Sequence, residues 1–281
     1  MIRRSSSLRL SRTPRLFQLF FIATLTLALI APMNFVLMTP GTPTSLFPKV
    51  LTVKGVKSYP ANGNIFLLTI YISNPESKIL GGFVLDCWAR EECVALPRSL
   101  YYDEKSDNEN EYKAAKKDMS KSQDSAYVAA RALMERRFPE VDISGFTEES
   151  LKVSLKNTGG PSGGLVFGLG IVELLTPVDL LQGRTVAGTG TISNDGTIGV
   201  IGGVSEKVIG AKSAGADLLF ISTENCYEMP ERVEGLTVVA VTSLDEVITY
   251  LLENPVQKEA ASGGASTSRS AEILGCASVG A

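Results

Sequence analysis

An uncharged apolar segment near the N-terminus constrains the fold of this chain more than any other feature. Residues 16–38, LFQLFFIATLTLALIAPMNFVLM, contain no Asp, Glu, Lys or Arg, and five arginines precede them. About 20 apolar residues in a helix can cross a hydrocarbon core about 30 Å thick, and basic flanks stay in the cytoplasm. The sequence therefore predicts a transmembrane helix over 16–38 behind a cytoplasmic basic tail over 1–15. A cleaved signal peptide is the alternative, and a buried core helix is a third.

The composition argues against several classes of protein. The 281 residues carry a net charge of −3, whereas a nucleic-acid-binding protein would present a basic surface. The chain contains no histidine, so the commonest metal ligand and the commonest general base are missing. We therefore expect no metal, no cofactor and no nucleic-acid partner. A Ser-His-Asp triad is impossible within the chain.

The four cysteines have no C-x-x-C spacing, so a zinc or thioredoxin-like motif is not indicated. Cys87 and Cys93 lie close together in the sequence. They can form a disulfide if this part of the chain lies outside the cytoplasm, and two unpaired thiols are the alternative.

The chain beyond the apolar segment shows two different patterns. Residues 64–73 and 79–88 are rich in β-branched and aromatic residues and are predicted strands, whereas residues 122–138 carry the apolar stripe of a helix. From Leu151, predicted strands alternate with predicted helices, which is typical of an α/β or α+β domain. The predicted strands of this second region are 151–157, 184–193, 197–201, 217–222 and 236–242, and the predicted helices are 161–175, 204–216 and 243–254.

A glycine-rich segment, Gly159-Gly160-Pro161-Ser162-Gly163-Gly164, precedes the first of these helices. Glycines allow a substrate carbonyl to approach the backbone, and unpaired amides at a helix start can face an oxyanion. Ser162 is therefore a candidate nucleophile. The alternatives are a glycine-rich turn with Ser162 as an N-cap, or a phosphate-binding loop, although the Gly-Lys-Ser/Thr of a P-loop is missing.

A lysine on a later helix is the candidate base. Val204, Lys207, Val208 and Ala211 fall at helical spacing on one apolar stripe. Burial in such a stripe disfavours the ammonium ion and lowers the lysine pKa, which makes the amine usable as a base. A snorkelling side chain at the edge of the stripe is the alternative.

The segment from about 151 to 254 resembles the proteolytic domain of Lon-type serine peptidases. The motifs that carry the resemblance are GGPSGGL, AGTGTISNDGTIGVIGG and EKVIGAKSAGAD. More closely, it resembles membrane-anchored bacterial Lon-like proteases that usually carry a PDZ domain. The resemblance implies a Ser-Lys dyad of Ser162 and Lys207, with Thr189 hydrogen-bonding near the lysine. We expect backbone groups around Gly160 and Pro161 to support the oxyanion.

Two features depart from the family pattern. Gly163 stands where the family usually has alanine, and we expect the smaller residue to fit but to loosen the helix start by up to about 1 kcal/mol. Between Leu133 and Leu151 the sequence leaves no space for a PDZ domain. No Walker motif is found in the sequence either, so we expect ATP-independent action on flexible or unfolded chains.

Together these features predict an α+β fold with α/β-type alternation, like the Lon proteolytic domain. We expect a membrane-anchored serine endopeptidase with its catalytic domain outside the cytoplasm, acting on peptide or protein substrates. By resemblance it would form a hexamer. A catalytically inactive membrane-tethered scaffold is the alternative. The expected divisions are a basic tail (1–15), a transmembrane helix (16–38), a juxtamembrane α/β region (39–140), a proteolytic domain (141–255) and a disordered tail (256–281).

Overall fold

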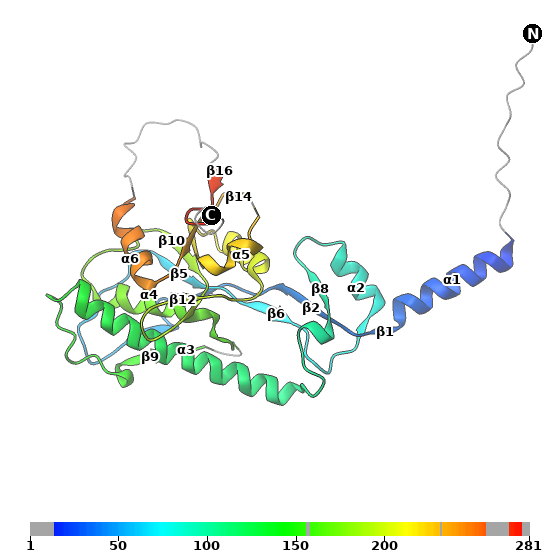
Figure 1. Cartoon of the computed structure of the whole chain (residues 1–281), viewed down its shortest axis with the longest axis horizontal. Coiled ribbons are helices and arrows are strands. Elements are labelled where there is room, and N and C mark those ends of the chain that lie inside the picture. Colours follow the sequence, from blue (N-terminus) through cyan, green and yellow to red (C-terminus); the bar gives the residue numbers. More distant parts are fainter. Residues whose placement is uncertain (1–13, 156–157, 231, 257–269, 277–281) are drawn as a thin grey trace, which may run out of the picture.

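A five-stranded, mostly parallel sheet forms the centre of the protein in a computed structural model that describes residues 14–155, 158–230, 232–256 and 270–276 (Figure 1). Four neighbouring strands run parallel and the last is antiparallel. In spatial order the strands are β15 (Thr237–Val241), β13 (Leu218–Ser222), β10 (Thr185–Gly188), β5 (Asn64–Leu67) and β3 (Thr44–Ser45).

Helices cover both faces of this sheet. Leu218 and Phe220 of β13 belong to the same apolar cluster as α3 (Asn108–Arg137), α4 (Gly164–Leu175) and α6 (Leu244–Glu253). Leu219 and Ile221 belong to a second cluster, with α5 (Val204–Ser213). A fully buried strand sends alternate side chains to opposite faces, so two cores form on one sheet. The predicted mixed α/β architecture is confirmed.

The expected boundary at residue 140 does not separate two packing units. Strand β5 pairs directly with β10, and buried residues of α3 pack in the same cluster as α4. The region before residue 140 therefore supplies two strands of the central sheet, β5 and β3, and one of its covering helices. Two further pairs are β4 (Leu51–Val53) with β9 (Leu151–Val153), and β11 (Thr191–Ile192) with β12 (Ile198–Gly199).

The N-terminal helix is shorter than the sequence predicts. Helix α1 (Arg15–Ile30) has 16 residues, and the next residue, Ala31, is extended because it precedes Pro32. β1 (Pro32–Met33) and β2 (Phe35–Pro40) follow. The prediction of one helix over 16–38 is therefore wrong beyond Ile30. In the described parts of the chain, no helix is both long and apolar enough to cross a membrane.

A small antiparallel sheet lies between α1 and the central sheet (Figure 1). It consists of β6 (Ile70–Ile72), β2 and β8 (Val94–Pro97). The predicted strand over 79–88 is wrong for most of its length, because only β7 (Ile79–Leu80) is extended and α2 (Gly81–Trp88) follows. Gly81, Val84 and Cys87 are the buried residues of α2, and this spacing of three is helical.

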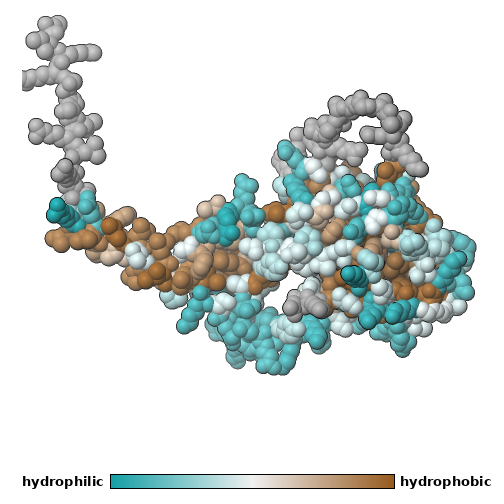
Figure 2. All heavy atoms as spheres, turned by 180° about the vertical axis from the view of Figure 1, so that it is seen from behind, coloured by the Kyte–Doolittle hydropathy of each residue, from teal (hydrophilic) through white to brown (hydrophobic). Residues whose placement is uncertain are grey.

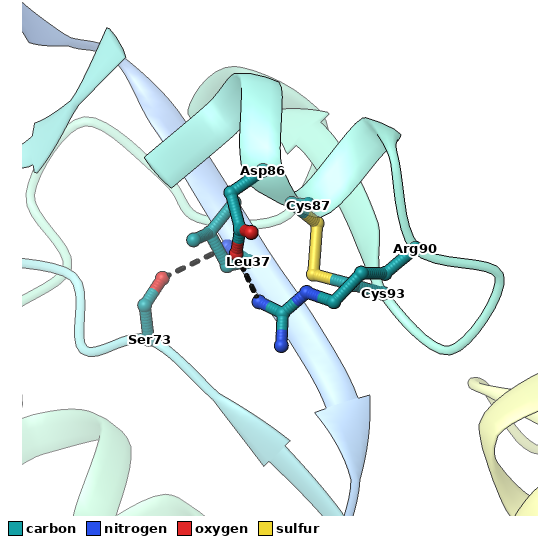
Figure 3. Close-up of a disulfide and its surroundings, with 6 residues drawn as sticks. All are labelled: Leu37, Ser73, Asp86, Cys87, Arg90 and Cys93. Atoms are coloured by element: carbon teal, nitrogen blue, oxygen red, sulfur yellow. Dashed lines mark hydrogen bonds and ion pairs between the residues drawn. A yellow bond between two sulfur atoms is a disulfide. The ribbon is translucent and has the colours of Figure 1, made fainter. Parts of the chain in front are cut away.

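The first disulfide closes α2 onto the loop before β8. Cys87 at the end of the helix forms a disulfide with Cys93 (Figure 3). Beside the disulfide, the exposed side chains of Asp86 and Arg90 form an ion pair with an N–O distance of 2.6 Å. The possible disulfide raised by the sequence is confirmed. The alternative of two free thiols is wrong.

The C-terminal end of the chain returns to the folded core. β14 (Arg232–Glu234) pairs with β16 (Ser270–Glu272), and Leu274 exchanges backbone hydrogen bonds with Val238 and Ala240 of β15. A second disulfide joins Cys276 to Cys226. The predicted disorder over 256–281 is therefore wrong for residues 270–276, and most of the remaining tail lies outside the described residues. The sequence signal of small polar residues could not show this covalent link.

Candidate active site

The glycine-rich segment forms a tight turn that leads into α4. Gly160 has a φ of 92°, which favours glycine, and Pro161 begins the short 3₁₀ helix η3 (Pro161–Gly163) immediately before α4. The Gly160 amide donates to the Ala115 carbonyl at 2.8 Å. The Ser122 hydroxyl donates to the Pro161 carbonyl at 2.9 Å. Helix α3 thus holds this turn from both sides of Pro161.

The carbonyl of Ser162 is fixed by the neighbouring loop. It accepts a hydrogen bond from the Gly190 amide at 2.9 Å and one from the Thr189 hydroxyl at 3.3 Å. The Gly190 carbonyl in turn accepts from the Leu165 amide at 3.1 Å. Ser162 itself is half-buried and lines a cavity. The backbone on both sides of the serine is therefore held while its side chain stays accessible.

Lys207 is the buried lysine that the stripe predicts. It lies one turn into α5 and is 3% exposed, so the snorkelling alternative is wrong. Burial lowers the pKa of Lys207 to about 8, although Glu206 and Glu228 act in the opposite direction. No salt bridge to Lys207 is present among the residues that the structure describes.

Ser162 and Lys207 line the same cavity, which has a volume of about 810 Å³. Its walls also include Tyr71 of β6, Gly160 and Ile201. The structure gives no hydrogen bond between the Ser162 hydroxyl and the Lys207 amine within its described residues. Catalytic hydrogen bonds are often long or poorly aligned in the absence of substrate.

The structure limits the roles of the three supporting residues. Thr189 is 1% exposed, and its hydroxyl donates to the Ser162 carbonyl, so its predicted orienting of the Lys207 amine stays a prediction. Pro161 has no N–H group, and the Gly160 amide is already bonded to Ala115. Gly160 and Pro161 therefore shape the turn, and neither can donate to an oxyanion in this arrangement.

Several residues around the site were not singled out in the sequence. Ser122 gives no signal because it lies in a charged helical stretch far from the glycine-rich turn. Asn225 is completely buried and binds both backbone groups of Ile201. Glu206, adjacent to Lys207, is also buried, but it lies outside the stripe of Val204, Lys207 and Val208, so helical spacing gave no signal for it.

The glycine-rich turn, the buried lysine and the strands between them lie within one segment that is similar to a known domain. Residues 117–254 match the Lon protease (S16) C-terminal proteolytic domain. The Lon-type segment therefore includes Ser162, Thr189 and Lys207, and it begins inside α3 rather than near Leu151.

Several relatives named as Lon proteases are also similar to part of this chain. Lon protease 2 of Bacillus subtilis is 37% identical over 98 residues, which is 34% of this chain and 17% of that protein. The Lon protease of Rickettsia felis is 35% identical over 104 residues, covering 35% of this chain and 13% of the relative. Lon protease 2 of Herpetosiphon aurantiacus is 32% identical over 149 residues, 50% of this chain and 18% of that protein. The chain spans less than a fifth of the length of these curated relatives.

Proposed function

We propose that this protein is a serine endopeptidase in which Ser162 is the nucleophile and Lys207 is the general base. One observation carries the proposal: a buried lysine with a lowered pKa lines the same cavity as an accessible serine at a helix start. Because the sequence has no P-loop pattern, we propose that it cleaves flexible chains without ATP.

The proposed reaction is acyl transfer in two steps. Neutral Lys207 accepts the proton of the Ser162 hydroxyl while the serine oxygen attacks a peptide carbonyl carbon. The tetrahedral intermediate collapses, the C–N bond breaks, and Lys207 gives the proton to the leaving amine. Water then attacks the acyl-enzyme with Lys207 as base, which releases the carboxylic acid and restores Ser162. The amides of Ser162 and Gly163 are the proposed oxyanion donors, because amides in the first turn of a helix lack partners within the helix.

The lowered pKa accounts for the choice of base. With a pKa of about 8, about one lysine in ten is neutral at pH 7. At the ordinary value of 10.5 only about one in 3,000 would be neutral. Burial therefore raises the amount of active base about 300-fold.

Covalent labelling of Ser162 tests this function. We expect a fluorophosphonate to add one label per chain at Ser162, detected by intact mass and peptide mapping. Ser162→Ala should remove the label and the cleavage of an unfolded protein such as casein. Lys207→Ala should slow both by several orders of magnitude, whereas Lys212→Ala, on an exposed position of the same helix, should change neither. An unlabelled wild-type protein would favour the inactive scaffold.

We propose further that α1 attaches the protein to a membrane, with the Lon-type segment outside the cytoplasm. Helix α1 has no buried residue, and an apolar surface continues from it toward α2 (Figure 2). Phe83, Leu85 and Trp88 are the large exposed apolar side chains of α2. Two disulfides also suit an oxidising compartment.

The start of α2 lies close against the last turn of α1, where glycine allows a close approach of the two backbones. A Cβ atom on Gly81 would lie 2.1 Å from the Ala28 carbonyl oxygen, so only glycine allows this approach. Helix α1 is about 24 Å long, less than a hydrocarbon core of about 30 Å. A membrane that covers α1 completely would therefore reach α2, where Trp88 suits the interface.

Flotation with lipid vesicles tests this attachment. We expect the full chain to float with vesicles of phosphatidylcholine and phosphatidylglycerol. Phe83→Ser with Trp88→Ser should weaken flotation, whereas Val128→Ser, an exposed apolar residue on α3, should not. Equal flotation of both variants would limit the membrane contact to α1.

We also propose that the protein forms a hexamer. Light scattering of the full chain in detergent measures the mass of the assembly and so tests this.

A further inference from the structure

A short helix beside the cavity holds the segment that precedes α5. The 3₁₀ helix η4 (Thr223–Glu228) follows β13 directly. The side-chain oxygen of Asn225 accepts from the Ile201 amide at 3.1 Å, and its amide group donates to the Ile201 carbonyl at 2.8 Å. The Glu224 carboxylate accepts from the Val200 amide at 3.1 Å. Three hydrogen bonds from η4 therefore fix two consecutive residues of this segment.

The held segment connects the cavity wall to the lysine. Val200, Ile201 and Gly202 line the cavity together with Lys207. Gly203 follows in the left-handed conformation, with a φ of 70°, and caps α5. The Lys207 amide donates to the Gly203 carbonyl at 3.1 Å. Asn225 is therefore connected to the backbone of Lys207 through its hydrogen bonds to Ile201 and through the short turn over 201–203.

The C-terminal segment fixes η4 from the other side. Cys226, next to Asn225, is bonded to Cys276. Ile273 is buried in the apolar cluster that contains Ile201 and Val208 of α5. The Lon-type match ends at residue 254. The disulfide and the buried Ile273 therefore attach η4 to a part of the chain beyond the matched segment.

We propose that Asn225 is a positioning residue for Lys207 and that the Cys226–Cys276 disulfide holds Asn225 in place. This inference rests on the proposed Ser-Lys chemistry. Among the described residues, the side-chain hydrogen bonds of Asn225 go to Ile201 and Glu228, and Asn225 is not part of the cavity wall. It acts through the backbone of Ile201, which keeps the start of α5 and the wall of the cavity in one arrangement.

The charged groups near Lys207 predict the effect of losing Asn225. Glu206 on α5 and Glu228 on η4 both favour the ammonium ion, and burial opposes them as the larger effect. The Asn225 amide group also donates to Glu228 at 3.3 Å. Without Asn225 the segment over 200–203 loosens and water reaches the lysine, so the ammonium ion becomes more favourable.

Titration of the lysine in the full chain tests the proposal. Protein labelled with ¹³C at the lysine ε-carbon, with Lys207→Arg to assign the signal, reports the midpoint directly by NMR. The second measurement is the rate of fluorophosphonate addition to Ser162 between pH 6 and 10. For Asn225→Ala we expect the midpoint to rise by at least about half a unit, which lowers the fraction of neutral lysine about threefold at pH 7.

The two disulfides provide matched variants. Cys226→Ser with Cys276→Ser should shift the Lys207 midpoint in the same direction by a smaller amount, and so should reduction of the folded wild type. Cys87→Ser with Cys93→Ser removes the distant disulfide and should leave the midpoint and labelling rate unchanged. All variants are compared well below their unfolding temperatures.

The possible results separate the two proposals. An unchanged Lys207 midpoint in Asn225→Ala overturns the positioning role, even if the labelling rate falls, because a purely structural defect lowers the rate without moving the titration. A wild type whose Ser162 takes no label overturns the proposed peptidase. The titration then still decides whether Asn225 sets the environment of the lysine.

Discussion

Replacing Glu173 with glutamine should stabilise this protein at neutral pH. Glu173 lies in the last turn of α4 and is 3% exposed. Its Oε2 atom has no hydrogen-bond partner among the described residues. Burial, and to a smaller extent Asp179, raise the pKa of Glu173 to about 7, although backbone amides of Asn62, Leu180 and Leu181 act against this. The folded protein therefore favours the protonated acid.

The direction of the pH dependence follows from this raised pKa. An acid with a higher pKa in the folded state binds its proton more tightly when folded, so the free energy of unfolding falls as pH rises. The fall begins near the unfolded pKa of 4.5 and is complete just above the folded pKa of about 7. At about 1.4 kcal/mol per pKa unit, the loss is about 3 kcal/mol.

Urea unfolding at pH 5 and pH 8 measures this effect. We expect Glu173→Gln to equal the wild type at pH 5 and to exceed its free energy of unfolding by up to about 3 kcal/mol at pH 8, because glutamine imitates the protonated acid. Glu140→Gln, at an exposed position, should leave the difference between the two pH values unchanged. If the free energy of unfolding changes between pH 5 and pH 8 by the same amount in Glu173→Gln and in the wild type, Glu173 is not a buried protonated acid.

Three further changes have expected outcomes. The rate of Ser162 labelling should rise with pH to a plateau, with a midpoint near 8 set by Lys207; a midpoint near 10 would contradict the buried base. Gly163→Ala should lower the free energy of thermal unfolding by about 1–3 kcal/mol, because the new Cβ would lie 2.8 Å from Leu67; a stabilised variant would show that this site can relax. Replacing Cys226 and Cys276 with serine should cost up to about 4 kcal/mol in urea unfolding, from the entropy of a loop with a sequence separation of 50, and no loss would mean that the unfolded chain is already compact there.

The helices and strands of the Lon-type segment could be predicted because each carries its own local signal. The apolar period that marks α4, α5 and α6 is present in the sequence, and the Ser243 hydroxyl accepts from the Glu246 amide at the start of α6. The sequence motifs also singled out Ser162 and Lys207, and both residues line one cavity. Nothing local showed that β5, which ends 140 residues before Lys207, pairs with β10 in the central sheet.

The failures at the two ends of the chain have physical causes. Hydropathy alone joined residues 16–38 into one helix, but Pro32 ends α1 and the alternating residues of β2 bury Val36 and Met38. At the other end, the small polar residues concealed Ile273 and the partner of Cys226. The departure at Gly163 also has a reason that only packing shows, since Leu67 occupies the space of an alanine methyl group.

The backbone of Leu274 has a consequence for anyone who prepares this protein. It covers part of the outer side of β15, which is the last strand of the central sheet. A chain shortened after residue 254 would keep the whole Lon-type segment, yet its β15 would present unpaired N–H and C=O groups. Such an open strand recruits other copies, so the shortened protein should aggregate where the full chain stays dispersed.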